Sequence, residues 1–335
     1  MPETKSREIR LKSRPVGLPS EGDFELVTVT LPEPGPGEVL VRNLYMSVDP
    51  YMRGRMFEQP SYVQPFQVGQ TLDGGCVGQV VQSRHPQMQA GEYVLGRQGW
   101  REWCLAEGAV LTKIDPTLVP IQAYLGALGM PGLTAYVGLL DIGKAKAGDT
   151  VFVSAAAGAV GSVVCQIARA RGCRVVGSAG SAAKIAWLRD VAGVDAAFNY
   201  KEVGALSEEL AKHCPQGVDV YFENVGGAHL EAALECLNQF GRIVLCGMIA
   251  HYNEATPGSG PRNLRLAVRK RLSLTGFIVS DHLERQAQFQ RDMGAWISAG
   301  KMHWQETIVE GIAKAPSAFI GLFHGENTGK MLVKL

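Results

Sequence analysis

The sequence has no paired-cysteine motif and almost no net charge. Its seven cysteines form no Cys-x-x-Cys pair, and an odd number of thiols cannot all join in disulfides. Because disulfides are rare in the cytosol, this usage favours a reduced, cytoplasmic protein. The 33 lysines and arginines nearly balance the 32 aspartates and glutamates. A chain so close to neutral has no general electrostatic attraction to nucleic acid or to an anionic membrane.

Long apolar segments suited to a bilayer are also lacking. The first residues, MPETKSREIRLKSRP, are charged and contain no apolar core of a signal peptide. Residues 116–140 and 150–168 carry no charge, but prolines and glycines interrupt the first and the second begins as a β-branched strand. We expect both stretches to be buried protein core.

Metal-ligand patterns are missing as well. None of the seven histidines has His-x-x-x-His or His-Glu-x-x-His spacing, and no cysteines cluster. We therefore expect no bound metal.

Glycine, by contrast, is abundant, with 40 in 335 residues. This is roughly 12%, against a typical share of about 7%. A chain of this length is near the size at which one hydrophobic core divides, so we expect two domains.

The rhythm of the sequence changes near its middle. Up to about residue 115, short extended runs such as FELVTVTL (24–31) and GEYVLG (91–96) alternate with Pro/Gly turns, which predicts a small β-barrel. From about Asp149, strands such as TVFVS alternate with helical segments, which is typical of βαβ units. The predicted fold is therefore α/β, with a doubly wound parallel sheet of the Rossmann type and a second, β-rich domain.

One glycine-rich turn lies between a predicted strand and a predicted helix. In TVFVSAAAGAVGSVVCQIARARG, small residues recur at Ala155, Gly158 and Gly161. Such a turn lets backbone N–H groups approach a pyrophosphate at the start of the helix. The alternative is that these glycines only allow close helix–sheet packing, but the strand–turn–helix context favours nucleotide binding.

The end of the next strand distinguishes between two dinucleotides. An NAD site usually has an acidic residue there for the ribose 2′-hydroxyl. Here the segment Val176–Ser181 has no carboxylate, and Lys184 follows. A cation with small polar neighbours attracts a 2′-phosphate, which favours NADPH over NADH. The alternative is that Lys184 is an ordinary solvated helix residue.

Several motifs resemble those of a known enzyme group, the zinc-independent medium-chain dehydrogenase/reductases. The resemblance is to prostaglandin reductases, also called leukotriene B4 12-hydroxydehydrogenases, and even more to bacterial NADPH-dependent curcumin reductases. It covers nearly the whole chain and rests on SVDPYMRGRM (47–56), GMPGLTAYVGLL (129–140), AAAGAVGSVVCQIA (155–168), GCRVVGSAGS (172–181), YFENVGG (221–227), GRIVLCGMIAHYN (241–253), GFIV (276–279) and NTGKMLVKL (327–335).

The resemblance implies a domain organisation and an assembly. A GroES-like β-barrel for substrate would occupy residues 1–128, and a Rossmann domain for NADPH would occupy residues 129–300. The segment 301–335 would return to the barrel. The family further implies a homodimer.

The resemblance also implies where NADPH is bound. The cofactor would contact the turns that follow several strands, and one residue of the tail. These residues are Gly158, Ala159, Val160, Gly161, Lys184, Tyr200, Asn224, Cys246, Gly247, Met248, Ile249, Ala250, His251, Tyr252, Phe277, Ile278, Val279 and Asn327.

Two tyrosines are candidates for contact with substrate. Tyr252 matches the family position proposed to steady an enolate or to supply its proton, although it could instead only pack against the cofactor. Tyr51 is expected to line the substrate pocket. Ser47 and Asp49 stand where zinc-dependent relatives have their first cysteine ligand, which again argues against zinc.

The expected reaction is reduction of a C=C bond conjugated to a carbonyl. Without a Lewis acid, the alkoxide formed from a simple ketone has little to hold it, whereas hydride at the β-carbon of an enone leaves an enolate that hydrogen-bond donors stabilise. The substrate would be a small apolar enone or enal. Two alternatives stay open: a quinone oxidoreductase and a non-catalytic NADPH-binding protein.

One basic cluster remains, formed by Arg262, Arg265, Arg269, Lys270 and Arg271. We interpret it as a solvated helix face rather than a surface for RNA or for steering NADPH.

Overall fold

The computed structural model describes residues 3–256 and 258–335. By backbone contacts it separates into two compact units, Met1–Leu125 with Glu306–Leu335, and Gly126–Gln305. The domain limits expected from the sequence, after residues 128 and 300, remain a prediction. The two units are described separately below.

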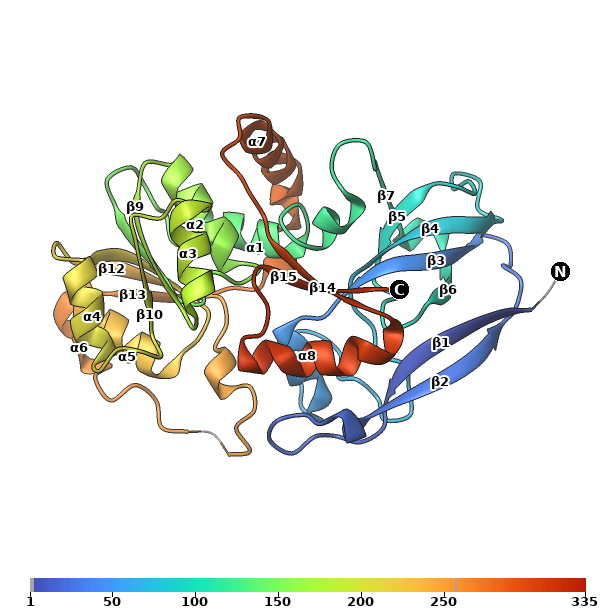
Figure 1. The fold of residues 1–335 in the computed structure, drawn as a ribbon, viewed down its shortest axis with the longest axis horizontal. Helices are drawn as coiled ribbons and strands as arrows, with labels where there is room; N and C mark the ends of the chain where they lie inside the picture. Colours follow the sequence, from blue (N-terminus) through green and yellow to red (C-terminus); the bar gives the residue numbers. More distant parts are fainter. Residues whose placement is uncertain (1–2, 257) are drawn as a thin grey trace. The chain divides into compact units, whose positions relative to one another are not determined.

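The first unit is built on a seven-stranded sheet, in which β14, β15, β3, β4, β5 and β7 follow one another and β6 pairs with β3. Strand β15, near the end of the chain, lies antiparallel to β3 (Figure 1). The strands of this sheet are β3 (Glu38–Ser47), β4 (Cys76–Ser83), β5 (Tyr93–Gly96), β6 (Trp103–Glu107), β7 (Thr112–Ile114), β14 (Glu306–Glu310) and β15 (Lys330–Lys334).

A hairpin of β1 (Thr4–Leu11) and β2 (Phe24–Leu31) and the helix α8 (Ala315–His324) complete this unit. Their packing centres on Trp100, which is fully buried. Its ring stacks on Phe24 at 6.0 Å between centroids and meets Phe319 of α8 edge-on at 6.1 Å. The expected β-rich unit is confirmed.

The second unit contains a six-stranded, fully parallel sheet in the order β10, β9, β8, β11, β12, β13. This is the doubly wound arrangement expected from the sequence. Its strands are β8 (Thr150–Val153), β9 (Arg174–Ala179), β10 (Ala196–Asn199), β11 (Val218–Glu223), β12 (Leu237–Leu245) and β13 (Ser273–Gly276).

Helices cover both faces of this sheet. Val151 and Val153 of β8 pack into one apolar cluster with residues of α1, α2 and α7, whereas Phe152 packs into another with residues of α4 and α5. Alternate residues of a strand point to opposite faces, which is why an all-apolar strand is buried on both sides. The helices are α1 (Met130–Val137), α2 (Gly161–Ala170), α3 (Ala182–Asp190), α4 (Leu206–His213), α5 (Gly227–Cys236), α6 (Arg265–Lys270) and α7 (Gln286–Ser298), labelled in Figure 1.

The strand order reverses between β8 and its neighbour β11. In open α/β sheets, ligands bind beyond the carboxyl ends of the strands at such a reversal. The predicted glycine-rich turn leaves β8 at this place. No helix in the described part of the chain is long and apolar enough to cross a membrane.

Candidate cofactor site

The turn between β8 and α2 has the shape of a phosphate cradle. Ala155 adopts a φ of +47°, a conformation that few side chains accept, and thereby turns the chain sharply after the strand. A Cβ added to Gly161 would lie 2.9 Å from the Cα of Ala156, so only glycine fits there. Gly158 and Val160 keep partial exposure. Within the described residues, the N–H groups of the segment 159–161 donate to no acceptor, which suits a bound anion.

The end of β9 carries hydroxyls and a cation and no carboxylate. Ser181 caps α3, since its hydroxyl accepts the Lys184 N–H at 3.4 Å. The Lys184 side chain is half-buried, and its pKa is lowered first by burial and then by the charge of Lys201. Tyr200, directly after β10, is 38% exposed. Lys184 and Tyr200 therefore flank the strand end where the sequence predicts the 2′-phosphate.

Tyr200 rests on a buried histidine that sequence reasoning missed. The rings of Tyr200 and His229 meet edge-on, with centroids 5.0 Å apart. His229 is 4% exposed, and its Nε2 lies 3.1 Å from the hydroxyl of Ser178 in β9. Burial lowers the pKa of His229 to about 4, so its imidazole is neutral at physiological pH.

A buried carboxyl group organises the end of β11. The Oε1 of Glu223 accepts hydrogen bonds from the hydroxyls of Tyr221 and Ser154, at 2.7 and 3.0 Å. The same oxygen accepts the N–H groups of Val225 and Gly226, at 2.6 and 2.8 Å. Burial raises the pKa of Glu223 above its usual range. Four donors thus converge on one oxygen beneath the turn that leaves the strand.

Asn224 is held by the neighbouring strand β8. Its N–H donates to the Ser154 hydroxyl at 2.9 Å, and its Nδ2 donates to the Ser154 carbonyl at 2.8 Å. The adjacent strands β8 and β11 are thereby joined at their carboxyl ends. Neither Ser154 nor Glu223 was predicted as a site residue, although a carboxylate directly after the run VYF (220–222) of a predicted strand is a signal that could have identified Glu223.

The segment after β12 folds onto the start of α5. His251 accepts the Gly227 N–H through Nε2 at 3.1 Å, while its Nδ1 lies 2.9 Å from Glu254 Oε1. The Tyr252 hydroxyl accepts the Met248 N–H at 3.3 Å. Burial raises the pKa of the Cys246 thiol to about 12, so this thiol is not a nucleophile at neutral pH.

The residues 277–279 continue directly from β13 and are half-buried. Phe277 packs against the apolar core of the second unit. A Cβ added to Gly138 would lie 2.8 Å from the Phe277 ring, so the absence of a side chain at Gly138 leaves room for this ring. All predicted cofactor residues of the second unit thus lie in the turns at the carboxyl edge of one sheet or in the helix that follows.

Two predicted residues belong to the first unit. Tyr51 lies in the 3-10 turn Pro50–Met56, and burial followed by the charge of Asp49 raises its pKa. Asn327 donates from Nδ2 to the Gly329 carbonyl at 2.7 Å.

At Ser47 and Asp49, where the resemblance implies a cysteine ligand in zinc-dependent enzymes, the first unit has a buried ion pair. Asp49 Oδ1 lies 3.1 Å from the ammonium of Lys330, and the Ser47 hydroxyl also donates to Asp49. In the described part of the chain, no group of three or more His, Cys, Asp or Glu side chains could hold a metal ion.

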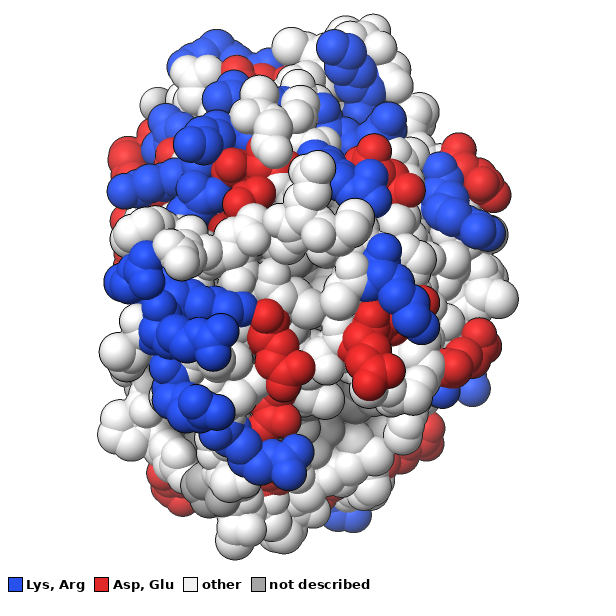
Figure 2. Space-filling view, turned by 90° about the vertical axis from the view of Figure 1, so that its left-hand side faces the viewer, with Lys and Arg blue, Asp and Glu red and all other residues white. Residues whose placement is uncertain are grey.

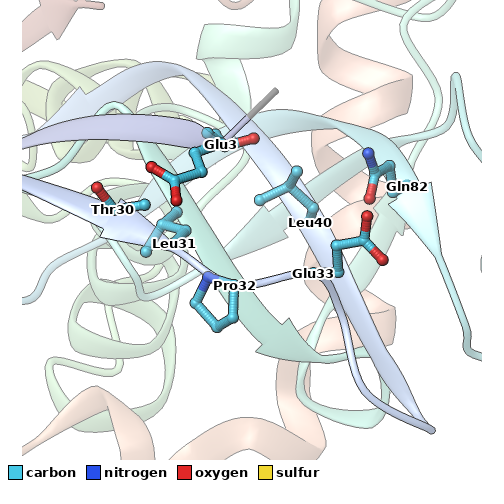
Figure 3. A pocket seen from close by; sticks show the side chains of 8 residues that line it. Glu3, Thr30, Leu31, Pro32, Glu33, Leu40 and Gln82 are labelled. Carbon is cyan, nitrogen blue, oxygen red and sulfur yellow. The ribbon is translucent and has the colours of Figure 1, made fainter. Parts of the chain in front are cut away.

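A hollow of about 320 Å³ lies elsewhere in the first unit (Figure 3). Its lining includes Thr30, Leu31, Pro32, Glu33, Leu40 and Gln82 and none of the predicted site residues. The strand ends of the second unit fit a dinucleotide with a 2′-phosphate much better than this hollow does. They combine a glycine turn with flanking cations and have no carboxylate at the end of β9.

The predicted basic cluster is mixed with acidic and polar partners. Figure 2 faces the left-hand side of Figure 1, where α6 is labelled, and shows lysine and arginine side chains interspersed with carboxylates. Arg262 pairs with Glu231 at 3.4 Å, and Lys270 donates to the carbonyls of Leu234 and Glu235 at the end of α5. Arg262 and Lys270 thus bind groups of the protein itself, which agrees with the interpretation of the cluster as a solvated helix face.

Comparison with known proteins covers the whole chain. The family described as "N-terminal domain of oxidoreductase" matches residues 7–114, and "Zinc-binding dehydrogenase" matches residues 159–299. The NADPH-dependent curcumin reductase of Escherichia coli is 44% identical over 99% of this chain and 97% of its own. The NADP(+)-dependent 2-alkenal reductase of Nicotiana tabacum is 44% identical over 99% of this chain and 98% of its own.

A solved structure also resembles this chain throughout. CurA from Vibrio vulnificus, crystallised in complex with NADPH, superposes with a TM-score of 0.93 at 42% identity. The superposition covers 98% of each chain.

Proposed function

We propose that this chain, which belongs to the medium-chain dehydrogenase/reductase family with the curcumin, 2-alkenal and prostaglandin reductases, reduces the C=C bond of α,β-unsaturated ketones and aldehydes with NADPH. The bound cofactor supplies hydride to the β-carbon of the substrate. The observation that carries the proposal is the carboxyl edge of the parallel sheet, where a glycine turn after β8 adjoins a β9 end with a cation and no acid.

The chain's own residues hold the cofactor in this proposal. The turn 158–161 offers the N–H groups of residues 159–161 to the pyrophosphate, and Lys184 with Tyr200 binds the 2′-phosphate. Asn224 contacts the cofactor, the segment 246–252 lies beside its adenosine and nicotinamide, and residues 277–279 line the carboxamide. Asn327 contributes from the tail. The fixed position of Asn224 on Ser154 supports its part in this set.

Tyr252 is the proposed group that steadies the enolate or supplies its proton. A phenol hydroxyl can accept one hydrogen bond and donate another, so accepting the Met248 N–H is compatible with donating to the enolate oxygen. Exchange of Tyr252 for Phe would lower kcat for an enone about 100-fold and change the Kd for NADPH less than threefold. An unchanged kcat would leave Tyr252 only the role of packing against the cofactor.

Tyr51 is the proposed lining of the substrate pocket. Its ring is largely buried and its phenol is neutral, with burial raising the pKa further, and a neutral aromatic side chain suits contact with a flat apolar enone.

The direct test compares substrates. NADPH oxidation is measured with an enone and with a benzoquinone, and the products are identified. A saturated ketone supports the proposal, whereas turnover of the quinone alone favours a quinone oxidoreductase. Tight NADPH binding without turnover across a broad enone panel favours a non-catalytic binding protein.

We also propose a homodimer. Strand β13 ends the order of the parallel sheet, and its backbone edge is a surface for pairing with a second copy. Nearby, Phe240 and Val268 are 65% and 81% exposed. Light scattering after gel filtration should give about twice the mass of 36.1 kDa.

A further inference from the structure

Two side chains from the turn after β10 lie over Gly180, the residue that follows β9. Ser181 and Lys184 come from the start of α3, and Tyr200 and Lys201 follow β10, the neighbouring strand. A Cβ placed on Gly180 would lie 3.1 Å from the Tyr200 hydroxyl and 3.1 Å from the Lys201 Cε. The hydroxyl and the carbon that bears the ammonium therefore lie over the same backbone atom.

The backbone of Lys201 is fixed although its side chain is exposed. The Asn199 Oδ1 accepts the Lys201 N–H at 3.2 Å, and the Tyr200 N–H donates to the carbonyl of Ala179 in β9 at 3.2 Å. These bonds hold the turn after β10 against the end of β9. Lys201 thus points its side chain across the strand end from a defined starting position.

The electrostatics of this place are unfavourable in the protein alone. The charges of Lys184 and Lys201 repel each other, and this repulsion contributes to the lowered pKa of Lys184. Within residues 3–256 and 258–335, Lys201 donates a hydrogen bond from its backbone N–H to Asn199, and its ammonium takes part in neither an ion pair nor a hydrogen bond. No acidic residue occurs in the segment 176–184 that it overlies. Because Lys201 adds a second positive charge close to Lys184, this strand end favours an anion of more than one charge.

We infer that Lys201 is a second cation for the 2′-phosphate of NADPH and determines, together with Lys184, the preference for NADPH over NADH. This inference rests on the proposed function, because it takes NADPH as the ligand. A 2′-phosphate dianion between the two ammonium groups would relieve their repulsion and accept a hydrogen bond from each. The family resemblance assigned only Lys184 and Tyr200 to this end of the cofactor and did not include Lys201, the neighbour of Tyr200.

The test uses two nucleotides that differ only in the 2′-phosphate. The Kd values of 2′,5′-ADP and 5′-AMP are measured by calorimetry at low ionic strength. Lys201→Gln should raise the Kd of 2′,5′-ADP roughly tenfold, which is the usual range for one hydrogen bond to a charged group. It should leave the Kd of 5′-AMP unchanged. Lys201→Arg, which keeps the charge, should stay within threefold of the wild type.

A matched control is Lys301→Gln, because Lys301 is an exposed lysine of the same unit that takes no part in an ion pair among the described residues. It should change neither Kd. Raised salt should shrink the effect of Lys201→Gln, because the interaction of exposed charges is screened.

Two results separate the inference from the proposed function. If the wild type prefers 2′,5′-ADP and Lys201→Gln keeps this preference within twofold, the inference is wrong and the proposed function stands. If the wild type binds both nucleotides equally, the NADPH specificity of the proposed function fails as well.

Discussion

Two regions at the same edge of the parallel sheet, the end of β11 and the paired ends of β9 and β10, are built in opposite ways. At the end of β11, the functional groups are buried, and one carboxyl oxygen of Glu223 accepts four hydrogen bonds. At the ends of β9 and β10, Tyr200 and Lys201 are exposed and Lys184 is half-buried. The first end depends on hydrogen bonds within the protein, and the second depends on charges that face a ligand.

The difference shows how stability and specificity are divided in the site. A buried network tolerates little change, because each buried donor that loses its acceptor lowers the free energy of unfolding. A pair of like charges of which one is exposed and the other only half-buried contributes little to folding, so its residues are available to select a cofactor. We therefore expect substitutions at β11 to destabilise the protein and substitutions at β9 and β10 to change its choice of nucleotide.

Replacement of Glu223 is the strongest way to break this comparison. Glu223→Leu would leave four donors without their shared acceptor and should lower the free energy of unfolding by about 4 kcal/mol. Urea denaturation measures this change. The control Glu223→Gln keeps an acceptor oxygen and should cost about 1–2 kcal/mol. If the leucine variant loses less than about 1 kcal/mol, the network is not what holds the turn.

The buried His229 beneath Tyr200 predicts a pH dependence of stability. Its pKa is about 4 in the folded chain and near 6.5 when unfolded. Above pH 6.5 His229 is neutral in both the folded and the unfolded state, so it adds no pH dependence to the stability. As the pH falls from 6.5 towards 4, only the unfolded state gains the proton, and stability is lost, by about 3 kcal/mol in total.

Urea denaturation of the wild type and of His229→Gln across this pH range isolates the effect from that of the carboxylates. The stability difference between the two proteins should decrease as the pH falls. A constant difference would mean that the pKa of His229 is the same in the folded and the unfolded protein.

Lys184→Ala should have the smallest energetic effect of these substitutions. It sharpens the comparison between the two regions because it tests the choice of nucleotide at the end of β9. Removal of this cation should raise the KM for NADPH severalfold, which corresponds to about 1 kcal/mol, and should barely change the KM for NADH. Its half-buried stem packs at the start of α3, so a modest fall in Tm is expected as well. Equal effects on both cofactors would contradict a role at the 2′-phosphate.

The sequence was sufficient to predict most of the parallel sheet of the second unit. It was not sufficient to predict β1, a strand of the first unit. Apolar strands buried on both faces, such as TVFV of β8, stand out in a sequence. Strand β1 does not, because polar residues face inward: Ser6 and Glu8 are buried, and Glu8 accepts a hydrogen bond from Thr71 at 2.6 Å. The partners of these groups are distant in the sequence and can be identified only in the folded chain.

The same reason limits what could be predicted of the site. The glycine turn and Lys184 follow local rules of strand, turn and helix, and the sequence alone indicates them. Glu223 meets Ser154 across 69 residues of sequence, and His229 meets Ser178 across 51. Lys201 becomes a neighbour of Lys184 only because β10 pairs with β9. Contacts of this kind depend on the order of the strands.

The measurement that tests the central claim most directly follows the hydride. Purified protein is given an α,β-unsaturated ketone and NADPH deuterated at the transferred position of its nicotinamide ring, and the product is analysed by NMR and mass spectrometry. The account predicts a saturated ketone that carries deuterium on the former β-carbon. An allylic alcohol with deuterium on the carbonyl carbon, or an unlabelled product, would contradict it.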